Sequence, residues 1–288
     1  MNLRRTAALG LATILAATSL TACGRGASDT DAIKLGTTEA DMGYWSVFID
    51  EADKAGLKIE TKQFADYNTP NRALAEGEID ANLFQHLKFL SEHNAASGDN
   101  LLPIGSTQIV PLALYWKGHN SIDGIEGQDV AVPNDPSNQG RAINVLVQAG
   151  LITLKTPGLV TPTPADIDEA ASKVKIVAVD SAQTPAVYNE GKPAVINNTF
   201  LERASIDPGL AVFKDDPNST EAEPYINAIV VREDKVNDEK LAKLVDVYHT
   251  EAVQKALAED SKGTSVEVKR DKEDLKKIVE RLEADAKK

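Results

Sequence analysis

The chain has 288 residues, of which 42% are hydrophobic and 26% charged. This balance is typical of a soluble globular protein and excludes a disordered or fibrous one. Its 44 acidic and 31 basic residues give a formal net charge of −13, which argues against nucleic acid as a partner because phosphates would be repelled. The single cysteine argues against a disulfide framework or a thiolate metal cluster within one chain.

The amino terminus has the features of a secretory signal. Arg4 and Arg5 precede an apolar stretch over residues 7–20, which is shorter than the span of about 20 residues that crosses a bilayer. The sequence Leu-Thr-Ala-Cys then ends at Cys23. We therefore expect residues 1–22 to be a signal peptide and the small, polar residues 23–30 to be a flexible tether.

The sequence before Cys23 resembles the lipobox of bacterial lipoproteins. This resemblance implies that the chain is cut before Cys23, that its thiol is lipidated, and that the protein is anchored at the extracytoplasmic face of the cell membrane. The alternative is an ordinary signal peptide followed by an incidental cysteine. That alternative would leave an unpaired thiol at the amino terminus of an exported protein.

Predicted strands and helices alternate in the first part of the body. Hydrophobic alternation and turn signals predict strands over 33–37, 57–64, 79–84 and 108–117. Helices are predicted over 44–54, from Asn68 to about Gly77, and after residue 84 to about Ala96. Pro111 suggests that the strand over 108–117 is broken or lies at an edge.

A second set of elements follows. Strands are predicted over 129–133, 173–179, 194–196 and 226–232. Residues 134–140 are predicted as a polar loop, and a helix as running from Arg141 to Gln148. From Asn237 onward the chain reads as charged helix, with residues 261–266 as a loop. This alternation predicts an α/β protein with mainly parallel sheets, covered on both faces and arranged in two lobes.

The motifs that carry well-known catalytic chemistry are missing from the sequence. It contains no nucleophile elbow, no zinc-protease helix motif, and no phosphate or dinucleotide loop. The four histidines never stand four residues apart, so we expect no helical metal site and no cofactor. Paired carboxylates such as Asp215 and Asp216 are predicted to be solvated surface groups. We therefore do not expect an enzyme.

Three segments rich in polar and aromatic residues stand at the ends of predicted strands, where open α/β sheets bind ligands. The first is FADYNTPN over 64–71, followed by DANLFQH over 80–86. The second is VAVPNDPSNQGR over 130–141. The third combines AVIN over 194–197 with EPYIN over 223–227.

Together these segments resemble the methionine-binding lipoprotein family (NlpA/MetQ type), the solute receptors of methionine ABC importers. The resemblance extends over nearly the whole body of the chain, with the segments in the same order and at similar spacing. It implies a two-lobed periplasmic-binding-protein-like fold of type II, with the ligand closed in a cleft between the lobes. It also implies ABC permease and ATPase subunits as partners.

The residues of these segments suit the polar groups of an α-amino acid. Arg141, predicted to open a helix, carries a planar fork that can hold a carboxylate with two hydrogen bonds. The N–H groups at the start of that helix would add to the attraction. Asn197 and Asn227 can each offer a carbonyl oxygen to an ammonium group.

Aromatic residues in these segments and just after DANLFQH suit a thioether side chain. The rings of Tyr67, Phe84 and Phe89 can contact sulfur at about 1 kcal/mol per contact. His86 can donate to the sulfur or hydrogen-bond the amino acid. The family often has tyrosine where this chain has Phe89, so the hydroxyl is lost and the enantiomer and exact substrate stay open.

Each of these residues also has a structural alternative. Arg141 would serve equally as a surface cation of a helix, and Phe84 as a core residue of a strand. His86 alone is compatible with a surface histidine. Asn197 and Asn227 also suit turns that close strand ends.

These observations predict a lipid-anchored, monomeric receptor that captures methionine (L or D) and delivers it to an ABC importer. Residues 31–112 and 226–288 are expected to form the first lobe, and residues 113–225 the second. The ligand would favour the closed form because it contacts both lobes. The alternatives are a receptor for another amino acid or a short peptide, a surface enzyme that uses the same cleft, and a structural lipoprotein.

Overall fold

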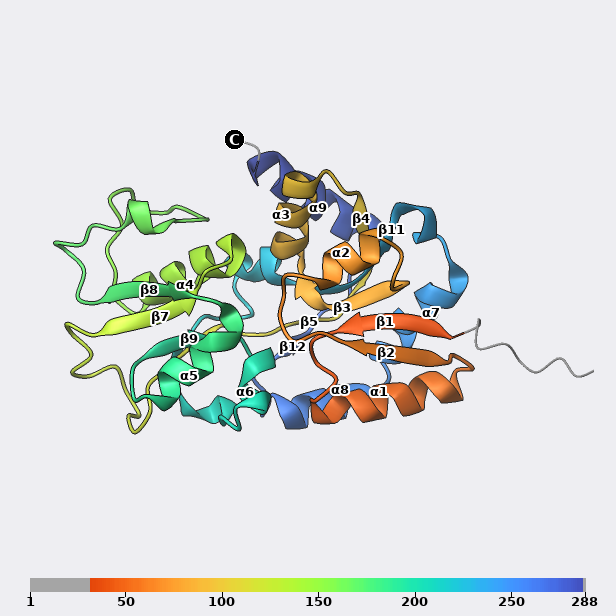
Figure 1. Cartoon of the computed structure of the whole chain (residues 1–288), viewed down its shortest axis with the longest axis horizontal. Helices are drawn as coiled ribbons and strands as arrows, with labels where there is room; N and C mark the ends of the chain where they lie inside the picture. The colour runs from red at the N-terminus through yellow and green to blue at the C-terminus, as the bar shows by residue number, and fades with distance from the viewer. Residues whose placement is uncertain (1–31, 287–288) are drawn as a thin grey trace, which may run out of the picture. The chain divides into compact units, whose positions relative to one another are not determined.

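Two five-stranded sheets organise the residues that the computed structural model describes, 32–286 (Figure 1). The predictions for the signal peptide, the tether and Cys23 lie outside these residues. The first sheet has the strand order β2-β1-β3-β11-β4. Its strands are β1 (Ile33–Thr37), β2 (Ile59–Gln63), β3 (Ala81–His86), β4 (Leu101–Ser106) and β11 (Asn227–Arg232).

The second sheet has the order β10-β6-β9-β7-β8. Its strands are β6 (Ala113–Tyr115), β7 (Asp129–Pro133), β8 (Lys175–Val179), β9 (Ala194–Ile196) and β10 (Ala211–Lys214). A small two-stranded sheet pairs β5 (Gln108–Ile109) with β12 (Val266–Glu267). β12 begins in the segment 261–266 that was predicted as loop, and β4 and β10 were not predicted at all.

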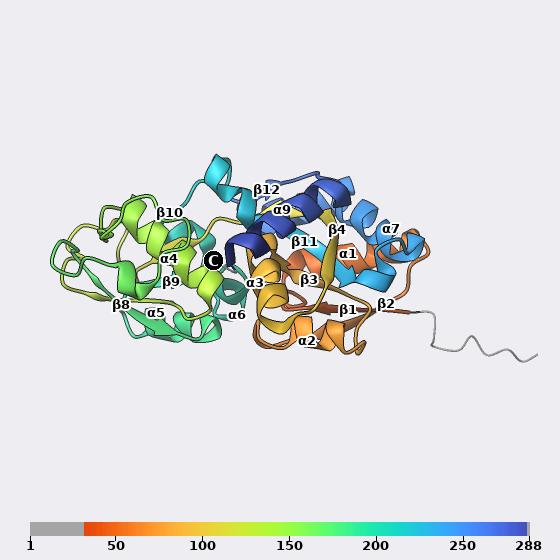
Figure 2. The same cartoon turned by 90° about the horizontal axis from the view of Figure 1, so that it is seen from above.

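Helices flank the sheets, as Figures 1 and 2 show from two directions. They are α1 (Gly43–Lys54), α2 (Pro70–Ala75), α3 (Leu87–Ser97), α4 (Pro136–Gln148), α5 (Thr184–Asn189), α6 (Thr199–Arg203), α7 (Glu239–Tyr248), α8 (Glu251–Asp260) and α9 (Lys272–Ala286). None of the helices in the described range is both long and apolar enough for a membrane span. The α/β class predicted from the sequence is confirmed.

The prediction of mainly parallel sheets is wrong, because each five-stranded sheet mixes both orientations. In the first sheet β1 runs parallel to β2 and β3, but β11 runs antiparallel to both β3 and β4. In the second sheet β7 runs parallel to β8 and β9, whereas β6 runs antiparallel to β9 and β10. Antiparallel pairing arises where the chain returns to a sheet without the crossover helix that a parallel pair needs.

The central strands of the first sheet are buried on both faces, as expected, but the edge strand β2 is largely exposed. Along β11, Ala228 and Val230 pack in one hydrophobic cluster, which includes residues of α3 and α9. Ile229 and Val231 point the opposite way, into a cluster with residues of α1, α7 and α8. Because successive side chains of a strand alternate between faces, a strand covered on both sides is apolar at nearly every position.

The chain leaves the first sheet at a break in the predicted strand over 108–117. The structure has two short strands there, β5 and β6, separated by residues 110–112. Pro111 lies in this break, where its missing N–H removes no ladder bond. The chain returns at Asn227, the first residue of β11.

Helix α4 begins five residues earlier than predicted. Pro136 occupies its first turn, and the side chain of Asp135 caps it by accepting from the N–H of Asn138 at 3.0 Å. The predicted polar loop over 134–140 is therefore mostly helix, and Arg141 lies in its second turn. The pair Asp-Pro is a helix start in its own right, since a capping carboxylate precedes a residue whose φ is already helical.

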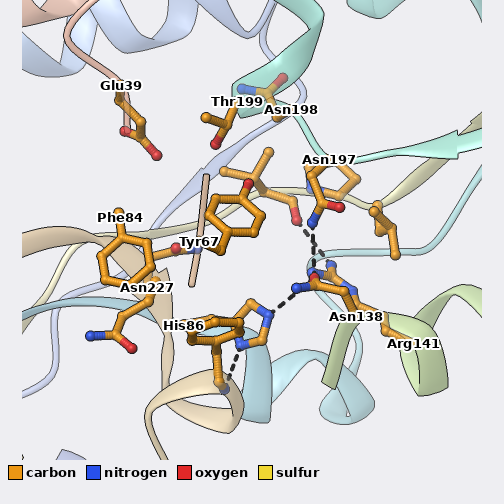
Figure 3. A pocket seen from close by; sticks show the side chains of 15 residues that line it. Glu39, Tyr67, Phe84, His86, Asn138, Arg141, Asn197, Asn198, Thr199 and Asn227 are labelled. Carbon is orange, nitrogen blue, oxygen red and sulfur yellow. Dashed lines mark hydrogen bonds between the residues drawn. The ribbon is translucent and has the colours of Figure 1, made fainter. Parts of the chain in front are cut away.

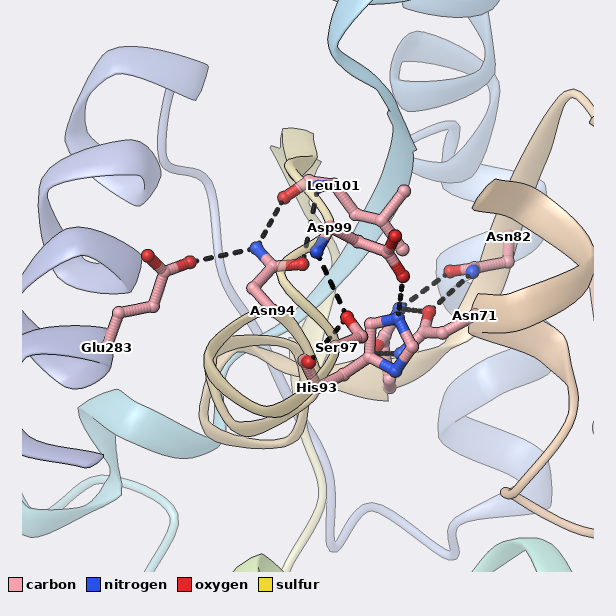
Figure 4. Close-up of polar contacts among 9 residues, drawn as sticks. Asn71, Asn82, His93, Asn94, Ser97, Asp99, Leu101 and Glu283 are labelled. Atoms are coloured by element: carbon pink, nitrogen blue, oxygen red, sulfur yellow. Dashed lines mark hydrogen bonds and ion pairs between the residues drawn. The ribbon is translucent and has the colours of Figure 1, made fainter. Parts of the chain in front are cut away.

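Helix α3 is fixed by polar contacts at its carboxyl end (Figure 4). The Asn94 amide donates to the carbonyl of Leu101 at 3.0 Å and to the carboxylate of Glu283 on α9 at 2.8 Å. The ring of His93 lies 2.8 Å from the carboxylate of Asp99. These contacts tie α3 to β4 and α9, and so hold the start of α3 in place.

Candidate functional site

One pocket is lined by residues of the first sheet, of α4 and of segments that adjoin the strands of the second sheet. Its lining residues are Glu39, Tyr67, Phe84, Gln85, His86, Phe89, Val110, Pro111, Leu112, Asn138, Arg141, Asn197, Asn198, Thr199 and Asn227. All seven ligand-binding residues predicted from the sequence are among them. The structure thus brings together residues that lie up to 160 positions apart in the chain. Their contact with a ligand stays a prediction.

Three aromatic rings form one side of the pocket (Figure 3). The ring centroids of Tyr67 and Phe84 lie 6.0 Å apart, those of Tyr67 and Phe89 6.0 Å, and those of Phe84 and Phe89 5.8 Å. The ring of Phe200 lies 5.0 Å from that of Tyr67. Tilted and edge-to-face rings at these distances attract one another. Tyr67, Phe84 and Phe89, here called the ring triangle, are therefore held in place by their own contacts.

His86 lies where β3 meets α3, and it caps that helix. Its Nδ1 accepts from the N–H of Phe89 at 3.1 Å, so the ring proton is assigned to Nε2. Nε2 lies 3.4 Å from the side-chain oxygen of Asn138. Burial, with help from the nearby Arg141 cation, lowers the pKa of His86 to about 3. The histidine is therefore a neutral donor at physiological pH.

A chain of side-chain amides continues from His86 across the pocket. The oxygen of Asn138 also accepts from the amide nitrogen of Asn197 at 2.8 Å, and the nitrogen of Asn138 donates to Asp135 at 2.8 Å. The side-chain amide oxygen of Asn197 is buried and has no hydrogen-bond partner among the described residues. An acceptor left in that state costs about 1–3 kcal/mol, which a ligand donor would offset.

Arg141 is 5% exposed and is already engaged on one edge of its guanidinium. Its Nε donates to Asp215 at 2.7 Å, and one terminal nitrogen, Nη2, donates to the carbonyl of Val110 at 2.9 Å. Its carbon lies 4.2 Å from the ring centroid of Tyr225. The other terminal nitrogen, Nη1, donates to none of the described residues. Arg141 therefore offers a ligand part of its fork rather than the whole of it.

Two sequence predictions about Arg141 and its surroundings need correction. It does not open a helix, because α4 starts at Pro136, so the first-turn N–H groups lie a turn away from it. The prediction that Asp215 is a solvated carboxylate is also wrong. Its side chain is 13% exposed and accepts from both Arg141 and the N–H of Leu112. The acidic partner neutralises much of the cation's field before any ligand arrives.

Asn227 lines the pocket from the start of β11, where the chain returns to the first sheet. Its amide nitrogen donates to the carbonyls of Gln108 at 3.3 Å and Tyr225 at 3.4 Å. These contacts turn the nitrogen towards the protein backbone. The side-chain amide oxygen accepts from none of the described residues, as an ammonium acceptor requires.

Other lining residues were missed or given another role. Asn138 was quoted in a motif but interpreted as a loop residue, although it joins His86 to Asn197. Gln85 belongs to a buried cluster with Asn71 and Asn82, in which the amides lie within 2.5–2.9 Å of one another (Figure 4). The repeated amide residues of DANLFQH were the signal for this cluster, which braces β3 beneath the pocket.

Glu39 had no signal in the sequence. It is half-buried in the loop between β1 and α1, lines the pocket, and accepts a hydrogen bond from the hydroxyl of Tyr44. Burial raises the pKa of Glu39 to about 7, against the opposing effects of the Tyr44 hydrogen bond and of Arg203. Within residues 32–286, no three histidine, cysteine or acidic side chains gather as a set of metal ligands.

Comparison with known proteins links this geometry to one family. The sequence model of the family described as NlpA lipoprotein matches residues 33–269. D-methionine-binding lipoprotein MetQ of Escherichia coli K12 is 36% identical over 259 residues, covering 88% of this chain and 94% of that protein. A probable D-methionine-binding lipoprotein MetQ of Vibrio cholerae is 36% identical over 264 residues, covering 89% and 96%.

Solved structures agree. Protein PG110 from Staphylococcus aureus superposes with a TM-score of 0.81 at 36% identity, covering 87% of this chain and 99% of that one. A nutrient binding protein from Burkholderia cenocepacia bound to methionine superposes with a TM-score of 0.74 at 35% identity, covering 82% and 99%. The two structures thus match more than four fifths of this chain.

Proposed function

Because this chain belongs to the NlpA lipoprotein family, we propose that it is an extracytoplasmic receptor that captures methionine and delivers it to an ABC importer. The observation that carries the proposal is the pocket itself. A ring triangle, a buried unpaired amide oxygen and an arginine line it together. These three features match the side chain, the ammonium and the carboxylate of one amino acid.

In this proposal the polar groups of the ligand meet residues of α4, of the segment just after β9 and of the start of β11. The carboxylate binds the terminal nitrogen of Arg141 that has no acceptor in the described protein. The ammonium donates to the side-chain amide oxygens of Asn197 and Asn227. Neutral acceptors suit a receptor that must release its ligand, because they leave less charge to be resolvated when the pocket opens.

The thioether of methionine lies in the ring triangle. Tyr67, Phe84 and Phe89 give sulfur the aromatic contacts that stabilise it by about 0.3–1.5 kcal/mol each. His86 stands at the junction of the two sides, where its Nε2–H reaches Asn138 or the ligand. Since Phe89 offers no hydroxyl, an enantiomer or a related amino acid that needs a hydrogen bond there is disfavoured.

Capture proceeds by hinge closure between two lobes, residues 31–112 with 226–288 and residues 113–225. The chain crosses between the sheets near residues 110–112 and again before Asn227, and these crossings are the proposed hinges. A ligand that contacts both lobes binds the closed form better and shifts the population towards it. A receptor of this kind returns its ligand chemically unchanged, so no catalytic role is assigned.

The proposal places the receptor at the extracytoplasmic face of the cell membrane. Residues 1–22 act as the signal peptide, and lipid on Cys23 anchors a monomer through the tether of residues 23–30. The ABC permease and ATPase subunits are its partners. Changing Cys23 to Ser should release the protein into the soluble fraction, and a variant that still pellets with membranes would contradict the anchor.

The ligand assignment is tested by calorimetry with L-methionine, D-methionine, leucine and methionine-containing dipeptides. The proposal predicts saturable binding of one methionine per chain, and the recovery of unchanged methionine from the complex. Binding of a dipeptide or another amino acid, with no response to either methionine enantiomer, would favour the alternative of a different solute. Conversion of the ligand would indicate an enzyme.

A further inference from the structure

Glu39 places a carboxyl group on the ring side of the pocket, where the proposed function puts a neutral side chain. Figure 3 shows it on the side of Tyr67 and Phe84, with Asn138, Asn197 and Arg141 on the other side. One of its oxygens is held by the Tyr44 hydroxyl. The other accepts from none of the described residues. A carboxyl in this position is unexpected for a site that takes a thioether.

Several ionisable groups face Glu39 from the elements packed around it. Tyr44 on α1 donates to it, while Tyr248 on α7 and Tyr67 lie close enough to interact with its charge. The carboxylate of Asp260 on α8 opposes its ionisation, whereas Arg203 on α6 favours it. Burial is the largest of the effects on Glu39, and Arg203 and Asp260 act on it in opposite directions.

Arg203 does not neutralise Glu39 by forming an ion pair with it. The guanidinium donates to the backbone carbonyls of Thr38 at 2.6 Å, Phe64 at 2.9 Å and Ala65 at 2.7 Å. Its remaining charged contact is with Asp41 at 3.3 Å. The hydrogen-bonding capacity of Arg203 is therefore directed elsewhere, and Glu39 is left without a cationic partner in direct contact.

The other ionisable groups of the pocket do not change its charge near neutral pH. His86 is neutral, since burial lowers its pKa to about 3. Arg141 is balanced by Asp215 at 2.7 Å. Glu39, by contrast, has a pKa raised by burial to about 7. Whether the pocket is neutral or carries one negative charge therefore depends on Glu39.

We propose that Glu39 is a specificity-determining residue and that its carboxyl group is protonated when the ligand is bound. A neutral side chain without a hydrogen-bond donor, such as a thioether, removes the remaining water from the carboxyl and gives nothing that stabilises a negative charge. The carboxyl then takes up a proton from solvent on binding. The inference rests on the proposed function, since it assumes a neutral side chain beside the rings.

Two consequences follow for the ligands that the pocket accepts. Neutral side chains bind more tightly as the pH falls, because the protonated carboxyl is the form that they favour. Anionic side chains are rejected above neutral pH, since they would face an ionised carboxyl in a poorly solvated space. Glu39 thus gives the pocket a preference based on charge that its rings and amides alone do not provide.

The test is calorimetry of the wild-type protein and Glu39→Gln with L-methionine between pH 6 and 8.5. With a group of pKa about 7 that becomes fully protonated in the complex, wild-type affinity falls by up to about tenfold from pH 6 to pH 8. At pH 7, titrations in two buffers of different ionisation enthalpy should report uptake of about half a proton. Glu39→Gln should bind with an affinity independent of pH.

Asp53→Asn is the matched control, because it removes an exposed carboxylate from α1, outside the pocket lining. It should keep the pH dependence of the wild type. Glutamate, as an anionic competitor, should displace methionine from Glu39→Gln at lower concentration than from the wild type at pH 8.

Three results would overturn the proposal while leaving methionine capture intact. They are wild-type affinity that does not change with pH, affinity that rises with pH, and a pH dependence that survives in Glu39→Gln. The wild-type proton uptake does not depend on how any variant folds. Failure of methionine to bind at every pH would instead contradict the proposed function and this inference together.

Discussion

The two sides of the pocket are held by different forces. On the ring side, Tyr67, Phe84 and Phe89 contact one another at 5.8–6.0 Å and need no ligand to stay in place. On the polar side, Arg141 and Asn197 are bound to Asp215 and Asn138, and each keeps some capacity unused. A ligand therefore adds contacts on the ring side and completes existing networks on the polar side. Changes to the polar side should cost more binding.

The largest effect is expected for Arg141→Ala. The ligand carboxylate loses its charge partner in a poorly solvated site, which costs about 2–5 kcal/mol of binding free energy. Calorimetry with methionine measures the loss. Arg281→Ala is the control, since Arg281 is an exposed cation paired with Glu223. Unchanged affinity in Arg141→Ala would remove this residue from the site.

His86 lies between the ring side and the polar side of the pocket, and the pH dependence of the free energy of unfolding tests its protonation state. The pKa of His86 is about 3 in the folded protein, against about 6.5 for an unfolded chain. Above pH 6.5 neither state holds the proton; below it the unfolded state binds a proton that the folded state excludes. The free energy of unfolding should therefore fall by up to about 1.4 kcal/mol per pH unit from pH 6.5 towards pH 3 through this group.

Urea unfolding at pH 7.5 and pH 5 measures this dependence in the wild type and in His86→Gln. The variant should lose less stability on acidification. His119→Gln, which changes an exposed histidine, is expected to behave as the wild type does. If His86→Gln and the wild type lose stability equally, His86 is not held neutral by burial.

Removing the unpaired acceptor should have a smaller effect. Asn197→Ala takes away one ammonium acceptor and one donor to Asn138, at a cost of about 1–2 kcal/mol of methionine binding. Asn218→Ala, in an exposed loop, is the control for the loss of an amide. Binding by Asn197→Ala at wild-type strength would show that the ammonium lies elsewhere.

On the ring side, Phe84→Leu keeps most of the apolar volume and removes the ring. Its cost should be about 1 kcal/mol of methionine binding, the value of one sulfur–aromatic contact. Phe48→Leu makes the same change in the core of the first sheet, among residues of α1, and should lower stability alone. A loss as large as that of Arg141→Ala would reverse the comparison between the two sides.

The smallest effect belongs to Phe89→Tyr, which adds a hydroxyl to one ring of the pocket. It should change methionine affinity by less than about 1 kcal/mol, because one added hydrogen bond contributes little net free energy. The ratio of L- to D-methionine affinity is the more sensitive measurement. An unchanged ratio would mean that the hydroxyl does not set the enantiomer preference.

The ring side was predictable from the sequence, because strand ends with aromatic residues are a local pattern. The bounds of β1, β7 and β9 agree with prediction, and the residues that follow strands converge as expected for the edge of a sheet. Contacts between side chains far apart in the sequence were harder to predict. Asp215 lies 74 residues from Arg141, and no local signal distinguished this buried carboxylate from a solvated one.

Two other errors have local causes. The start of α4 was misplaced because a run of polar residues was interpreted as loop, although Asp135 and Pro136 cap and begin a helix. Glu39 was overlooked because a single acidic residue after a strand is compatible with solvent exposure. Its surroundings include Tyr44 on α1 and the more distant Arg203 on α6 and Asp260 on α8.

The most direct test of methionine capture is a crystal structure of the protein grown with L-methionine. The account predicts the carboxylate about 3 Å from the Nη1 nitrogen of Arg141, and the ammonium against the oxygen of Asn197. The sulfur should lie about 5 Å from the rings of Tyr67 and Phe84. A methionine whose sulfur faces Arg141, or a pocket that stays empty at saturating methionine, would contradict the account.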